Sequence, residues 1–196
     1  MLIFDYYYVH FGFNYNPISA LIAFLINMVF MCIAYYAFYY MFFDVSLNRF
    51  AYYLFFFVLS MNWFLFSLDL MTCFIGWELL GYFSFLLISY WFYRQNTIKC
   101  AFQAFVIGRL GDFFLMSAAI IIVRDCAGIL DIFFINMILY DFSINLFIVI
   151  FIFICASTKT TQFGLHIWLP NAMEGPIPDA LTAFHSLVGW LFWRCF

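Results

Sequence analysis

The strongest chemical signal in the sequence is Lys159, a single amine inside the long apolar segment Phe142–Met173. The stretch Phe142–Thr158 carries no charged residue, so nothing close in sequence neutralises this amine. An ionisable side chain at bilayer depth costs about 2.5–3.5 kcal/mol or more to insert, and it is by default a candidate functional group. Polar residues and a glycine follow, which predicts a transmembrane helix broken around Gln162–Leu165. Ion and proton carriers use such breaks, with a titratable group beside them.

Further polar groups lie inside other apolar segments. Glu78 lies roughly 14 Å into its segment, near the middle of a hydrocarbon core of about 30 Å. Arg109 and Asp112 have i, i+3 spacing, so they share a helix face and can form an ion pair. His185 lies inside the final apolar segment. Because unpaired groups of this kind would add roughly 10 kcal/mol to insertion, we expect them to face one another or water.

Each of these groups also has a purely structural interpretation. Arg109 and Asp112 could simply hold two helices together, and Glu78 could form a static ion pair with Lys159. His185 could be a hydrogen-bonded packing residue. A carboxylate, an amine and an imidazole at depth can nevertheless accept and donate protons in turn, because making and breaking an ion pair changes the proton affinity of both partners. The set as a whole favours a proton relay of Glu78, Lys159 and His185.

The composition is that of an integral membrane protein. Hydrophobic residues make up 69% and charged residues 9% of the chain, whereas soluble domains have about 45–50% and about 25%. The alternation typical of membrane β-barrel strands is absent from the sequence. We therefore expect an all-α, polytopic transmembrane helical bundle of about six spans. The predicted spans are Pro17–Phe43, Ala51–Leu68, Asp69–Tyr93, Ile98–Val123, Phe142–Met173 and Asp179–Arg194.

The remaining segments predict the domain organisation. We expect a single membrane domain over residues 1–196, with residues 1–16 as an N-terminal extramembrane segment. Residues 124–141 are expected to form a loop with a short interfacial helix, because their apolar stretch is too short to span. His166 lies beside Trp168 near an expected helix end, which suits a residue at the membrane interface.

Loop charges give a weak prediction of orientation. The loops with Arg49, Arg94 and Lys99 carry three basic residues, against two in the opposite loops. The excess of Lys and Arg favours the cytoplasmic or matrix side for the first set of loops. We expect the two polar stretches Asn48-Arg49 and Arg94-Gln95-Asn96 to lie in loops rather than in helices.

Several classes of chemistry have no motif in the sequence. The six cysteines are scattered, without a CxxC motif or zinc-ligand spacing, and no phosphate-binding glycine loop occurs. No basic run suggests nucleic acid, so lipids are the expected surroundings. The 32 Phe and 14 Tyr residues have AT-rich codons. They favour an AT-rich organellar genome, although heavy use of aromatic residues in a helical membrane protein is an alternative explanation.

Three stretches resemble the subunit 5 family of mitochondrial NADH dehydrogenase, respiratory complex I. Gly76–Ile88 resembles the family's helix with the essential glutamate. Gly108–Asp112 resembles the next helix and its Asn-Arg-x-Gly-Asp pattern, with Gly108 in place of the asparagine. Lys159–Pro178 is the most specific stretch, because its run Ala172–Pro176 separates subunit 5 from the antiporter-like subunits 2 and 4.

The resemblance implies roles for individual residues. Glu78 matches the glutamate that pairs with a channel lysine, and Lys159 matches that lysine. His185 matches the central histidine of the next helix. Arg109 and Asp112 match the family's arginine and aspartate. Together with His166, these two residues are expected to support the relay.

The resemblance also implies a function. The expected role is that of a membrane subunit of the proton-translocating NADH:ubiquinone oxidoreductase in the mitochondrial inner membrane, with an antiporter-like fold of which this chain is a part. No cofactor is expected in this chain, and NADH, FMN, iron–sulfur clusters and ubiquinone would belong to other subunits. The expected partners are the other membrane-arm subunits, including a chain that carries the rest of subunit 5. Two alternatives remain open: a subunit of a multisubunit cation/proton antiporter, or a structural scaffold with a degenerate channel.

Overall fold

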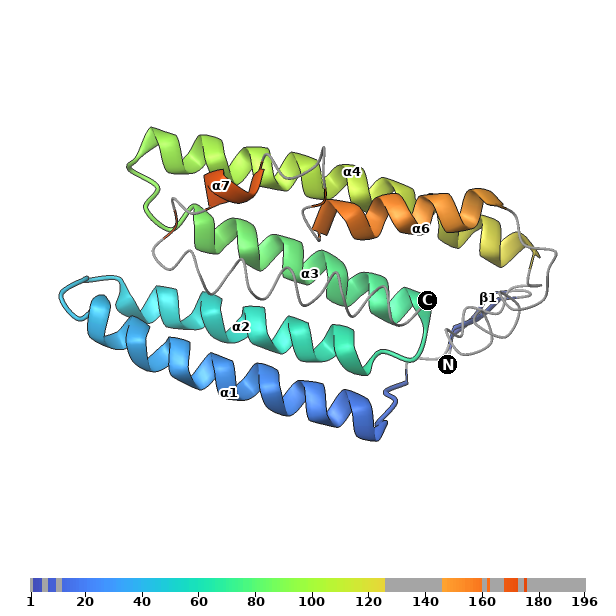
Figure 1. Ribbon diagram of the computed structural model, residues 1–196, viewed down its shortest axis with the longest axis horizontal. Coiled ribbons are helices and arrows are strands. Elements are labelled where there is room, and N and C mark those ends of the chain that lie inside the picture. Colours follow the sequence, from blue (N-terminus) through green and yellow to red (C-terminus); the bar gives the residue numbers. More distant parts are fainter. Residues whose placement is uncertain are drawn as a thin grey trace.

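Helices that run side by side make up nearly all of the described structure (Figure 1). The computed structural model describes residues 2–4, 7–9, 12–125, 146–159, 162, 168–172 and 175. The helices are α1 (Pro17–Tyr40), α2 (Leu47–Phe66), α3 (Leu70–Ile88), α4 (Gln95–Asp125), α6 (Leu146–Lys159) and α7 (Trp168–Ala172). Near the N-terminus, β1 (Leu2–Phe4) and β2 (Tyr7–Val9) pair antiparallel, with Ile3 opposite Tyr8. The sequence analysis did not anticipate this hairpin.

The prediction of a helical membrane protein is confirmed for the described part of the chain. Four helices, α1 to α4, are long and apolar enough to cross a membrane, and α6 is a shorter apolar helix. The first four predicted spans agree with α1 to α4 to within about five residues at their ends, whereas the predicted span Phe142–Met173 contains the two shorter helices α6 and α7. The predicted span Asp179–Arg194 and the predicted interfacial helix after α4 lie outside the described residues.

Most residues of the two polar stretches that we expected in loops belong to helices instead. Arg49 lies in the first turn of α2, and Gln95 and Asn96 begin α4. The guanidinium of Arg49 donates to the carbonyl of Tyr90 at 3.3 Å and lies 5.1 Å from the centroid of the Tyr90 ring. Because a helix end has its own backbone groups to satisfy at the membrane surface, polar residues there do not require a loop.

The helix starts follow from local hydrogen bonding. At the start of α1, the backbone N–H of Asn16 donates to the hydroxyl of Ser19 at 3.0 Å, and Pro17 takes the first helical position, where no N–H is needed. At the start of α3, the N–H of Asp69 donates to the hydroxyl of Thr72 at 3.2 Å. This second capping interaction begins a new helix directly after α2, so that α2 and α3 form a tight antiparallel pair.

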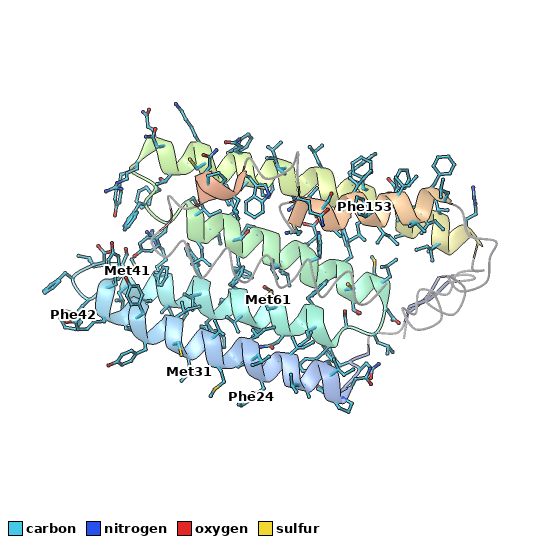
Figure 2. The ribbon with its side chains drawn as sticks, in the orientation of Figure 1. Phe24, Met31, Met41, Phe42, Met61 and Phe153 are labelled. Carbon is cyan, nitrogen blue, oxygen red and sulfur yellow. The ribbon has the colours of Figure 1, made fainter. Side chains whose placement is uncertain are left out.

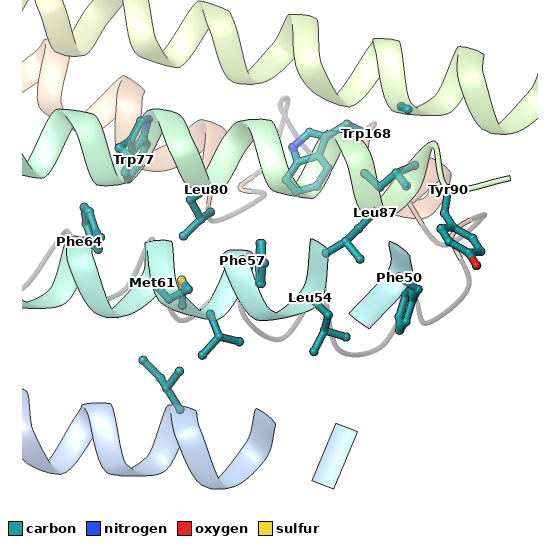
Figure 3. Packing of buried hydrophobic residues seen from close by; sticks show 14 of the residues in the cluster. Phe50, Leu54, Phe57, Met61, Phe64, Trp77, Leu80, Leu87, Tyr90 and Trp168 are labelled. Carbon is teal, nitrogen blue, oxygen red and sulfur yellow. The ribbon is translucent and has the colours of Figure 1, made fainter. Parts of the chain in front are cut away.

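The core lies between α2 and α3 (Figure 3). A Cβ atom on Gly76 would lie 2.9 Å from the backbone N and Cα of Phe64, so the two helix backbones are in close contact there. On its other side α3 packs against α4, which also contacts α6 and α7. Met61 is buried, whereas Phe24 and Met31 extend from the outer face of α1 (Figure 2). That outer face therefore suits contact with lipid.

Candidate functional site

The bundle brings together four of the residues that the sequence analysis selected. Glu78 comes from the middle of α3, Arg109 and Asp112 come from α4, and Lys159 is the last residue of α6. Arg109 lies within ion-pair distance of both carboxylates. Lys159 interacts electrostatically with Asp112, Glu78 and Arg109. The two predicted histidines, His166 and His185, lie outside the described residues, so the histidine arm of the relay stays a prediction.

Arg109 joins the two carboxylates. Its guanidinium donates a hydrogen bond to the carboxylate of Glu78 and lies 3.5 Å from the carboxylate of Asp112. It also lies 4.6 Å from the centroid of the Phe105 ring, where a cation is attracted by the π face. The predicted contact between Arg109 and Asp112 is therefore present, but the closer partner of Arg109 is Glu78, on the neighbouring helix.

Lys159 is buried, with only 4% of its surface exposed. Among the described residues, no carboxylate oxygen lies within 4.0 Å of its Nζ. The structure therefore shows no direct ion pair between Glu78 and Lys159, and that pairing stays a prediction. Arg109 binds the Glu78 carboxylate instead, whereas Nζ of Lys159 lies 5.0 Å from the centroid of the Trp77 ring.

Trp77 contributes to the site, and the sequence analysis missed it. Its indole N–H donates to Oδ1 of Asp112 at 2.7 Å. Both residues are buried, with 1% of Trp77 and 9% of Asp112 exposed. A buried indole N–H needs an acceptor, but the sequence does not reveal this one because Asp112 lies on another helix.

Small residues on α4 shape the space around the amine. A Cβ atom on Gly111 would collide with Oγ1 of Thr158, so α4 and α6 approach each other closely there. A Cβ atom on Gly108 would meet no atom within 4 Å, because Gly108 borders a cavity of about 30 Å³. This volume is enough for a water molecule, which needs about 10–15 Å³. The cavity is lined by Gly81, Ser84, Phe85, Ala104, Phe105, Gly108, Arg109, Asp112, Thr158, Lys159 and Trp168.

Two hydrogen bonds fix the position of α7, which follows Lys159 in the chain. The indole N–H of Trp168 donates to the backbone carbonyl of Thr158 at 3.1 Å, which satisfies a carbonyl in the last turn of α6. The amide of Asn171 donates to the side chain of Gln103 on α4 at 2.7 Å. Gln162, between the two helices, is not helical. In Figure 1, α6 and α7 follow one another alongside α4.

Comparisons with known proteins agree on one family. Residues 67–188, which include all four described site residues, match the family described as NADH:quinone oxidoreductase/Mrp antiporter, transmembrane. The chain is 47% identical over 119 residues to NADH-ubiquinone oxidoreductase chain 5 of Trypanosoma brucei brucei, covering 60% of this chain and 20% of that protein. It is 33% identical over 175 residues to chain 5 of Candida albicans, covering 87% of this chain and 31% of that protein.

A chloroplastic relative and a solved structure extend the comparison. The chain is 35% identical over 177 residues to the chloroplastic NAD(P)H-quinone oxidoreductase subunit 5 of Coffea arabica, covering 87% of this chain and 24% of that protein. A chain of the Mrp complex from Dietzia sp. DQ12-45-1b has a similar fold, with a TM-score of 0.61 and 24% identity. That match covers 71% of this chain and 16% of the other. The chain thus spans from a fifth to less than a third of the length of these three curated relatives.

Proposed function

The chain belongs to the family of NADH:quinone oxidoreductase subunit 5 and Mrp antiporter membrane subunits, and from this premise we propose that it is a piece of a proton-translocating subunit of complex I. In this proposal the chain contributes to the proton-translocating NADH:ubiquinone reductase as a translocase subunit. Redox chemistry with NADH, FMN, iron–sulfur clusters and ubiquinone takes place in other subunits. The chain contributes one proton path across the membrane.

A single observation carries this proposal: Lys159 is buried beside a water-sized cavity and has no carboxylate within 4.0 Å among the described residues. A buried ammonium without a direct ion pair is expensive to maintain, so its proton is easily given up when a nearby charge moves. A water molecule in the cavity would give Lys159 a route for receiving and releasing that proton. A proton carrier must receive and release its proton in this way, whereas a residue that only holds two helices together need not.

The two carboxylates supply a switch for that proton. Arg109 contacts Glu78 and is also 3.5 Å from Asp112, so it can exchange one carboxylate for the other. When Arg109 moves toward Asp112, the Glu78 carboxylate is free to approach Lys159 and favours its protonated form. When Arg109 returns, Lys159 loses that support and passes its proton on. The proposed acceptor is His185, which the sequence analysis assigned and whose imidazole suits a relay near neutral pH.

The rest of the proposal concerns membrane setting and partners. We propose that α6 and α7 are the two halves of a broken membrane helix in a bundle of about six spans. The proposed location is the mitochondrial inner membrane, with an organellar gene, supported by the similarity to the NADH-ubiquinone oxidoreductase chain 5 proteins of Trypanosoma and Candida. The proposed partners are the other membrane-arm subunits of the complex.

A subunit of a multisubunit cation/proton antiporter is the second candidate, and the fold similarity to the Mrp complex favours it. Purification of the tagged chain from native membranes, followed by mass spectrometry, separates the two. Complex I membership predicts that flavin- and iron–sulfur-containing subunits co-purify with the chain. Recovery of an intact complex without those redox subunits, with cation/proton antiport on reconstitution, would reverse the choice.

A further inference from the structure

Trp77 contacts two charged groups of the site at once. The N–H of its indole donates to Asp112 at 2.7 Å, and Nζ of Lys159 lies 5.0 Å from its ring centroid. The distance to the ring centroid lies within the range of about 6 Å in which a cation is attracted to an aromatic face. The indole nitrogen is turned away from Phe64 and α2 (Figure 3). The ring therefore connects an amine on α6 to a carboxylate on α4.

Glu78 follows Trp77 directly in the sequence but faces a different group. Adjacent residues of a helix do not share a face, so a single turn of α3 presents two side chains in two directions. The Glu78 carboxylate binds Arg109, whereas the Trp77 indole binds Asp112. One turn of α3 thus engages both acidic groups of the site: Glu78 binds Arg109, and Trp77 donates to Asp112, which Arg109 also approaches at 3.5 Å.

Gly81 lies one turn after Trp77, on the same face of α3. A Cβ atom at this position would lie 3.4 Å from Nζ of Lys159, which is the limit of ordinary contact. The absence of a side chain at Gly81 lets the ammonium rest against the helix backbone, beside the indole. The two residues together define where the end of the lysine side chain lies.

We propose that Trp77 is a positioning residue, which holds the amine of Lys159 on the Asp112 side of α3 until its proton is passed on, and keeps the amine from Glu78 until Glu78 is released by Arg109. This inference rests on the proposed function, because it assigns a task to Trp77 only if Lys159 carries the proton. Its indole N–H fixes the Asp112 carboxylate, and its π face stabilises the ammonium without forming an ion pair. The amine is thus stabilised while it stays free of any direct carboxylate contact.

The test is a set of variants in the assembled complex in native membranes, measured as proton translocation per electron during NADH oxidation. Trp77→Phe keeps an aromatic ring but removes the N–H donor, and we expect the proton-translocation rate through this path to fall by about tenfold. The double variant of Trp77→Phe with Asp112→Asn should translocate protons no more slowly than Asp112→Asn alone. In Asp112→Asn the hydrogen bond from the Trp77 indole is already weakened, because its acceptor is no longer charged. The double variant with Glu78→Gln should show the product of the two single effects.

Trp63→Phe is the matched control. The indole nitrogen of Trp63 is buried and has no hydrogen-bond partner among the described residues, so this substitution removes no bond and should leave pumping unchanged. Trp77→Tyr, which keeps an aromatic face and an O–H donor, should retain more activity than Trp77→Phe. A residue that only fills space would not distinguish these two variants or couple selectively to Asp112.

Lys159→Met is measured in parallel to separate this inference from the proposed function. Full pumping by Lys159→Met would overturn both. Loss of pumping in Lys159→Met, combined with normal pumping in Trp77→Phe, would overturn only the role of Trp77. The role of Trp77 would also be overturned if Trp77→Phe lowered proton translocation by the same factor in the Asp112→Asn background as in the Glu78→Gln background. If neither Trp77 variant assembles, Trp77 is a packing residue and the proposal fails.

Discussion

Arg109 on α4 forms its ion pair with Glu78 on α3, although Asp112 lies one turn away on its own helix. This ion pair differs from the pairing that the family resemblance implied, in which Glu78 pairs with Lys159. An arginine that crosses between helices holds them together and neutralises the glutamate, so the buried Lys159 is left without a direct carboxylate partner in the described part of the chain. In the proposed relay, Arg109 therefore controls which carboxylate is available to the amine.

Arg109→Gln should weaken the contact between α3 and α4, because it leaves the carboxylate of Glu78 without its partner. We expect a loss of about 1–3 kcal/mol in stability, reduced from the value for fully buried pairs because both side chains are partly exposed. Arg109→Lys should retain more of this stability. Thermal inactivation of the assembled complex measures the effect. A complex with Arg109→Gln that is as stable as the wild type would contradict the cross-helix role of Arg109.

The two glycines of α4 offer a matched pair of variants. Gly111→Ala places a methyl group against Oγ1 of Thr158, and overpacking of this kind costs about 1–3 kcal/mol. Gly108→Ala points into open space and should assemble normally. Thr158→Ala should partly rescue Gly111→Ala, because it removes two of the three atoms that the methyl group meets. Quantifying the assembled complex on native gels checks the order. Equal assembly of both single variants would show that α4 and α6 do not approach closely at Gly111.

The hydrogen bond between Asn171 and Gln103 fixes α7 to α4. Removing one partner of a partly buried bond leaves the other unsatisfied, whereas replacing both with apolar residues is nearly neutral. Asn171→Leu should therefore destabilise the complex more than the double variant with Gln103→Leu does, with a coupling of about 1 kcal/mol. A double-mutant cycle on thermal inactivation provides the measurement. Strict additivity of the two substitutions would mean that this contact does not hold α7.

The structure groups two basic residues at one end of the bundle. Arg49 stacks on the rings of Tyr90 and Phe92, and Arg94 lies 5.1 Å from the centroid of the Trp91 ring. The loops that follow α1 and α3 therefore share one membrane side. This is the side that the positive-inside rule assigns to the matrix.

Cysteine labelling in oriented vesicles tests this orientation. In a background without native cysteines, Asn48→Cys and Asn96→Cys should react with an impermeant reagent from the matrix side, and Tyr15→Cys, which precedes α1, from the other side. Reaction of Tyr15→Cys from the same side as the other two would contradict the predicted topology.

The sequence was sufficient to predict the helical membrane fold and to select Glu78, Arg109, Asp112 and Lys159, which the structure brings together. Long uncharged segments can only be helices in a bilayer, and a buried charge stands out against them, so Glu78 and Lys159 could be identified. The pairing could not be predicted, because it depends on the rotation of α3 relative to α4, which hydropathy does not determine. Trp77 was missed because an aromatic residue in an apolar helix looks like packing, and its acceptor lies on another helix.

The helix ends show the same limit on a smaller scale. Arg49 was expected in a loop because it is charged, but its cation is stabilised by the aromatic rings of the neighbouring turn. Those contacts join residues that are far apart in sequence. Local composition therefore predicted the span, and tertiary contacts decided where the helix begins.

Proton translocation per electron in the Lys159→Met variant tests the central claim most directly. Met has a similar length and no titratable group, so the fold should persist while the proton carrier is lost. Lys99→Met, at the exposed start of α4, is the matched control and should keep the wild-type ratio of protons to electrons. We predict that Lys159→Met assembles with the redox subunits but translocates fewer protons per electron. An assembled Lys159→Met complex with the full ratio would contradict the role of Lys159 as the proton carrier.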